Sequence, residues 1–198
     1  MVKADCKGCE GCSACCRGMG KSIVLDPLDV HRLTTGLGVP FEALLSKHIE
    51  LNVVDGLILP NLKMTESADA CPFLNGQGRC SIHAYRPGIC RLFPLGRFYE
   101  NDSFRYFLQV HECLKPSKAK IKVYKWLDTD DIRTYEQFIS DWHYFLKALQ
   151  ERIAGMEDQT QIRSICMYVL QQFYLAPCED FYEAFHGRLD EAKRYFEM

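Results

Sequence analysis

The sequence lacks several features that would assign it to common functional classes. No stretch approaches the roughly 18 consecutive apolar residues that a membrane-spanning helix needs, and residues 1–12 carry no apolar run typical of a secretory signal. The formal net charge is -2, which gives neither a basic footprint for nucleic acid nor a polybasic membrane anchor. Rossmann, P-loop and zinc-protease motifs are also missing. These absences predict a cytoplasmic protein that binds neither nucleic acid nor membranes.

Cysteine, in contrast, is abundant, with 11 residues in a chain of 198. Five of them fall within residues 6–16, interleaved with glycine, serine and alanine. Small residues between thiols let a short backbone fold around an ion, and several converging thiolates are how proteins hold soft metals. In a reducing compartment such clusters are metal or redox sites, and disulfides are the alternative. The first cluster therefore predicts a metal centre that takes further ligands from later in the chain.

Those further ligands are expected in a second cysteine-bearing segment. A turn at residues 75–78 allows Cys71 and Cys80 to approach one another, and two prolines restrict the backbone around Cys90. Eight thiols suffice for two four-thiolate sites, or for one cluster with spare ligands, and their spacing does not divide them. Whether Cys6, His83 or His111 is also a ligand stays open. The candidate ligands are Cys9, Cys12, Cys15, Cys16, Cys71, Cys80, Cys90 and Cys113.

Three arginines, Arg79, Arg86 and Arg91, lie among these thiols. A cation beside a thiol stabilises the thiolate, but we expect structural pairing with carboxylates for each arginine. Cys166 and Cys178 lie far from the cysteine pattern, and we expect both to be ordinary buried thiols.

Hydrophobic periodicity predicts an α+β fold, in which a small irregular cysteine-rich region with short antiparallel strands packs against a mostly helical C-terminal half. We expect the cysteine-rich region at residues 1–114 and the helical region at 115–198, with a basic connector at 115–122. Asp26-Pro27 is a typical helix start, because Asp caps the helix and Pro suits its first position. Further helices are predicted after Pro40 and at 132–153, 159–175 and 179–196, strands at 22–25 and 57–64, and a hairpin from 97–100 to 103–109.

The sequence resembles the YkgJ-like cysteine cluster family, zinc- or iron-chelating proteins named for the pattern CxxCxxCC. This resemblance implies metal binding through cysteine thiolates and leaves the metal undefined. It covers about half of the chain and does not extend to the C-terminal helices. The residues that carry it are Cys9–Cys16, Leu25–Val30, Cys71–Leu74, Cys80–His83, Arg86-Pro87, Cys90-Arg91 and Phe93-Pro94.

The spacing of the first cluster favours iron over zinc. Cys6, Cys9, Cys12 and Cys16 reproduce the C-x2-C-x2-C-x3-C run of bacterial ferredoxins, with Arg17 where proline is usual. The second segment has no C-x2-C pair of the kind that zinc ribbons repeat. We therefore predict a cytoplasmic iron-sulfur protein, of the 4Fe-4S type, that acts in electron transfer or in a redox modification.

Two other functions fit the same thiols. One is a zinc-binding structural or interaction module that presents its helical half to a protein partner, and the other is a redox or metal-storage protein with labile thiols. The sequence leaves open whether the chain is an enzyme, and it assigns no substrate, redox partner or oligomeric state.

Overall fold

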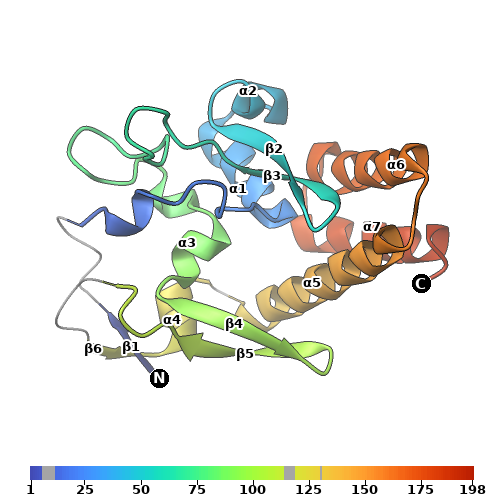
Figure 1. The fold of residues 1–198 in the computed structure, drawn as a ribbon. Coiled ribbons are helices and arrows are strands. Elements are labelled where there is room, and N and C mark those ends of the chain that lie inside the picture. The colour runs from blue at the N-terminus through green and yellow to red at the C-terminus, as the bar shows by residue number, and fades with distance from the viewer. Residues whose placement is uncertain (6–11, 114–118, 130) are drawn as a thin grey trace.

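The structure is a computed structural model that describes residues 1–5, 12–113, 119–129 and 131–198 (Figure 1). The fold is α+β, as predicted, with short antiparallel strand pairs and a mostly helical C-terminal half. The strands are β1 (Val2–Asp5), β2 (Ile49–Val54), β3 (Leu57–Leu62), β4 (Leu95–Glu100), β5 (Ser103–Leu108) and β6 (Ala119–Ile121). The helices are α1 (Pro27–Leu37), α2 (Phe41–Leu45), α3 (Gly88–Leu92), α4 (Val123–Leu127), α5 (Ile132–Ala154), α6 (Gln159–Val169) and α7 (Phe181–Tyr195), with short helical turns η1 (Ala14–Cys16), η2 (His83–Tyr85) and η3 (Leu170–Leu175).

The strands pair as β1 with β6, β2 with β3, and β4 with β5. The predicted hairpin is confirmed as β4–β5, in which Leu95 faces Leu108 and both residues of the Asn101-Asp102 turn have positive φ. Turns of this kind match the right-handed twist of the two strands they connect. The pairing of β1 with β6 joins the start of the cysteine-rich region to the segment that follows it, and it has no signal in the local sequence.

Helix α1 begins where the Asp-Pro pair predicts it. The side chain of Asp26 accepts a hydrogen bond from the N–H of Asp29, and the side chain of Asp29 accepts one from the N–H of Asp26. This reciprocal pair satisfies two N–H groups that the first turn of a helix leaves free. Asp29 also accepts a 2.6 Å hydrogen bond from the N–H of Gly88, so one buried carboxyl group joins α1 to the start of α3.

Helix α5 carries the main apolar face of the C-terminal half. Phe138 and Trp142 are buried, and their rings lie 4.7 Å from Phe185 of α7 and 5.0 Å from Phe173 of η3, respectively. These aromatic contacts explain why the apolar residues at helical spacing in the predicted helices lie in the hydrophobic core. In Figure 1 these helices lie on the right, whereas the loops that carry the cysteines lie on the left.

Two local predictions differ from the structure. The segment expected as a strand at 22–25 forms only an isolated bridge from Val24 to Asn61, so the predicted strand was wrong. Its backbone is nevertheless tied to β3, because Leu25 N–H donates to the carbonyl of Pro60 at 2.8 Å. The helix expected at 159–175 consists of α6 followed by the π-helical turn η3.

None of the helices in the described part of the chain combines the length and apolar character needed to cross a membrane.

The double role of Asp29 predicts a large effect of its removal. Asp29→Ala should lower the free energy of unfolding by about 2–4 kcal/mol, because two N–H groups in a buried setting lose their acceptor. Urea unfolding measures this loss. Asp180→Ala is the matched control, since Asp180 caps α7 through one exposed hydrogen bond and its removal should cost about 1 kcal/mol. Equal losses in the two variants would contradict the structural role given to Asp29.

Candidate metal centre

The first described cysteines lie in and beside the turn η1. Cys16 N–H donates to the carbonyl of Ser13 at 3.0 Å, which closes the turn and leaves Cys15 and Cys16 half-buried. A hydrogen bond with the Cys16 thiol, together with burial, raises the pKa of Cys15. The two adjacent thiols therefore face one another, rather than diverging as they would in an extended chain. Cys9 and Cys6 lie outside the described residues.

Backbone pairing brings Cys71 to this turn. Cys71 N–H donates to the carbonyl of Cys16 at 2.8 Å, and Arg17 forms an antiparallel bridge with Ala70. Gly18 N–H extends the pairing by donating to the carbonyl of Asp69 at 2.7 Å. Main-chain hydrogen bonds thus connect two segments that are 55 residues apart at Cys16 and Cys71.

The predicted reversal between Cys71 and Cys80 is present. Leu74 bridges Cys80, and the side chain of Asn75 accepts hydrogen bonds from the N–H groups of Gln77 and Arg79 at 3.0 and 2.9 Å. An asparagine side chain that accepts backbone N–H groups in this way stabilises a tight turn. The turn returns the chain to Cys71 and places Cys80 in the same region.

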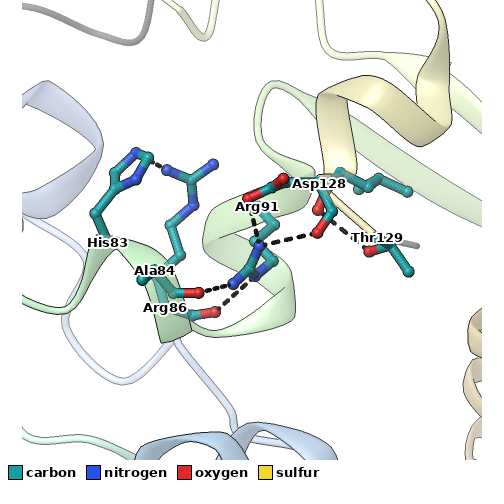
Figure 2. Close-up of polar contacts among 7 residues, drawn as sticks. His83, Ala84, Arg86, Arg91, Asp128 and Thr129 are labelled. Carbon is teal, nitrogen blue, oxygen red and sulfur yellow. Dashed lines mark hydrogen bonds and ion pairs between the residues drawn. The ribbon is translucent and has the colours of Figure 1, made fainter. Parts of the chain in front are cut away.

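Cys90 comes from the short helix α3. Gly88, the first residue of α3, is fixed by Asp29, and the buried Arg91 fixes the rest of the helix. Figure 2 shows that the Arg91 guanidinium donates to the carbonyls of Ala84 and Arg86 and to Asp128, its ion-pair partner at 3.3 Å. Arg91 therefore pairs with a carboxylate and has a structural role. It joins the η2 loop and α3 to the end of α4.

Four thiols interact with one another through these connections. Burial is the main cause that raises the pKa of Cys90, the charge of Asp29 is the next, and the thiols of Cys71, Cys15 and Cys80 raise it further. Burial also raises the pKa of Cys71, with contributions from Cys80 and Cys15, and that of Cys80, with a contribution from Cys15. We call Cys15, Cys71, Cys80 and Cys90 the thiol cluster. Its members come from three separate parts of the chain and face one common region.

The thiol side chains do not yet converge on one point. Within the described ranges, no three Cys, His, Asp or Glu side chains lie close enough together to bind one ion. The backbone connections nevertheless fix the relative positions of the four cysteines, and a cysteine side chain turns about a single χ1 angle. Soft thiol donors at these positions fit zinc or an iron-sulfur cluster, both of which accept four cysteine ligands.

Arg86 provides positive charge at the thiol cluster. It lowers the pKa of both Cys15 and Cys80, although burial and the neighbouring thiols outweigh it. Its Nε is buried and has no hydrogen-bond partner among the residues with described positions. Its Nη1 contacts Nε2 of His83 (Figure 2). Burial and the cation of Arg86 both lower the pKa of His83, so this imidazole is neutral at pH 7 and faces an arginine.

The other predicted ligands are placed less centrally. Cys12 and Cys113 are half-buried, but within the described chain neither is among the groups that most strongly shift the pKa values of the thiol cluster. His111 is exposed and has a φ of 73° in the turn that follows β5. Sequence spacing alone could not make this division, because it depends on the pairing between distant segments.

The two cysteines of the helical half differ from one another. Cys166 is buried as expected, whereas Cys178 is only half-buried and its Sγ lies 3.6 Å from Nδ1 of His31. The expectation that Cys178 is an ordinary buried thiol was therefore wrong, because the chain leaves the helix near Pro177 and turns this thiol toward α1.

Comparison with known proteins gives one match. The family model CxxCxxCC, described as "Putative zinc- or iron-chelating domain", matches residues 8–125. No curated protein and no solved structure matches the chain. The matched range includes every member of the thiol cluster, together with Asp29, Arg86 and Arg91. It extends over more than half of the 198 residues, and the chain therefore belongs to the CxxCxxCC family of zinc- or iron-chelating proteins.

Proposed function

We propose that the thiol cluster holds one metal site and that this site carries an iron-sulfur cluster of the 4Fe-4S type. The observation that supports this most directly is that Cys15, Cys71 and Cys80 all raise the pKa of Cys90, while Cys15 also raises that of Cys71 and of Cys80. An iron-sulfur cluster takes four cysteine ligands, and it supplies one-electron transfer when bound. The activity that follows is electron transfer, or a redox modification of a substrate, in the cytoplasm, with a redox protein as partner.

The residues around the thiols suit this role. Four thiolates bring negative charge to a half-buried region, and Arg86 offers a cation with a buried Nε donor. A hydrogen bond to a ligating sulfur stabilises its negative charge and raises the reduction potential of the group it holds. Buried thiols with raised pKa hold their protons until metal binds, so loading releases protons and weakens at lower pH.

The remaining predicted ligands would serve a second site. Cys16 adjoins Cys15, and Cys9, Cys12 and Cys113 complete a second set of four. Such a site would lie directly beside the first, because adjacent residues would supply a ligand to each. In this proposal residues 1–114 form the metal-binding region and residues 115–198 the helical region.

A zinc-stabilised structural or interaction module is the second candidate. The supporting observation is that the thiol cluster draws its members from three separate parts of the chain, which a structural zinc site would tie together. In that case the helical half would present the surface for a protein partner.

Metal and acid-labile sulfide analysis, with an absorption spectrum, tests the proposal on protein purified without oxygen and without a metal-binding tag. We expect iron with sulfide and visible absorption, because thiolate-bound iron clusters are coloured. Near-stoichiometric zinc in a colourless protein would contradict the iron-sulfur proposal and support the zinc module, since d10 zinc has no visible band.

Matched variants show whether the thiol cluster is the site. Cys71→Ser should remove most of the bound metal, whereas Cys178→Ser should leave the metal content unchanged, because Cys178 faces His31 and not the cluster. Circular dichroism of both variants separates loss of metal from loss of the fold. Full metal content in a folded Cys71→Ser protein would contradict the assignment of the four ligands.

A further inference from the structure

A second polar site lies across α3 from the thiol cluster. Ile89 and Leu92 of α3 line a cavity of about 470 Å³, whereas the thiol of Cys90, between them in sequence, interacts with the cluster. The cavity also reaches the start of α1, strand β4 and helix α5. In Figure 1 α3 stands between the cysteine loops and α5. A volume of this size is in the range of small-molecule sites.

Arg97 of β4 supplies a fixed positive charge to this cavity. Its guanidinium lies over the rings of Phe104 and Tyr135, at 5.5 and 5.6 Å from their centroids, and Nη2 donates to Tyr135 Oη at 2.7 Å. Its Nε is buried and has no hydrogen-bond partner in the part of the chain that the structure describes. Among the ion pairs of that same part, none within 4.0 Å involves Arg97. A buried donor without a partner costs free energy until an acceptor reaches it.

Two carboxyl groups line the same cavity but do not occupy this donor. Both oxygens of Asp29 accept backbone N–H groups, from Gly88 and Asp26, and Oδ1 of Asp26 accepts the N–H of Asp29. Burial raises the pKa of both acids, and Asp26 raises that of Asp29 further, which favours the protonated form of each acid. Arg97 and then Arg32 lower the pKa of Asp26, and Arg32 lowers that of Asp29, so Asp26 faces the charge of Arg97 without a hydrogen bond to its Nε. The Nε donor of Arg97 thus remains free for an acceptor that enters the cavity.

The rest of the lining is aromatic and aliphatic. Trp142 and Leu146 of α5 form part of the wall, together with the ring of His143, which stacks on Tyr99 at 3.5 Å between centroids. Burial and the nearby Lys147 lower the pKa of His143, so this imidazole adds a polar contact without a second cation at neutral pH. An occupant therefore meets the guanidinium of Arg97 together with aromatic and aliphatic surface.

We propose that this cavity binds a small organic monocarboxylate with an apolar body, whose carboxylate pairs with the guanidinium of Arg97. A planar guanidinium matches a carboxylate with two parallel hydrogen bonds, and the buried Nε would gain its missing acceptor. A dianion such as phosphate fits less well, because one arginine beside two buried acids compensates one negative charge and not two. The site stands on its own residues and does not depend on which metal the thiol cluster holds.

Titration calorimetry with three probes tests this on the full-length protein as purified. Phenylacetate should bind with a dissociation constant of about 1 mM or lower. Phenylacetamide, which has the same shape without the charge, should bind at least about tenfold more weakly. Inorganic phosphate should also bind more weakly than phenylacetate. Equal affinity for phenylacetate and phenylacetamide, tighter binding of phosphate, or no binding of phenylacetate at about 10 mM would overturn the proposal.

Variants locate the site. Arg97→Gln should weaken phenylacetate binding at least about tenfold. Arg97→Lys should weaken it less, because lysine keeps the positive charge but lacks the two parallel N–H donors of the guanidinium. Arg105→Gln is the matched control, because Arg105 lies on the neighbouring strand with an exposed side chain and should leave the affinity unchanged. Unchanged affinity in folded Arg97→Gln would overturn the assignment. If Arg97→Gln does not fold, the relative affinities of phenylacetate and phenylacetamide for the unmodified protein test the proposal.

Discussion

The hydrogen bond from Gly88 N–H to the carboxyl group of Asp29 is the contact on which both sites depend. It joins the first turn of α1 to the first residue of α3 at 2.6 Å in a buried setting. A Cβ atom at Gly88 would lie 2.9 Å from Tyr135 Oη, so only glycine lets α3 approach α5 this closely. The position of α3 then determines which side chains face the thiols and which face the cavity.

The proposed metal site combines a prepared backbone with side chains that have not converged. Main-chain hydrogen bonds hold the segments of Cys16 and Cys71 together, the Asn75 turn returns Cys80, and Asp29 with Arg91 fixes the helix of Cys90. What remains for the metal is to draw the thiols together and to displace their protons. In such a site the free energy of metal binding adds to the stability of the surrounding loops more than to that of the helical half.

Local sequence patterns predicted the structural elements that are determined by residues close together in the chain. The Asp26-Pro27 cap, the Asn101-Asp102 hairpin and the apolar face of α5 each follow from neighbouring residues. The pairing of β1 with β6 and the grouping of four thiols depend on contacts between distant segments, which no local pattern encodes. Eight candidate ligands could thus be identified from the sequence, whereas their division could not.

Three arginines show the same limit of sequence-based prediction. Arg86 and Arg91 were both candidates to stabilise thiolates, but only the contacts show that Arg91 serves the backbone of the η2 loop and that Arg86 faces the thiols. Arg97 carried no signal at all, because its role arises from a cavity between β4, α3 and α5. Residues of one type, close together in sequence, thus acquire different functions through packing.

X-ray absorption at the edge of the bound metal tests the central claim, that Cys15, Cys71, Cys80 and Cys90 together ligate one site. The account predicts a first shell of sulfur alone in the unmodified protein. It predicts that Cys90→Ser replaces a sulfur by a lighter ligand or loses the metal, whereas Cys178→Ser leaves the first shell unchanged. Nitrogen or oxygen ligands in the unmodified protein, or an unchanged first shell in Cys90→Ser, would contradict it.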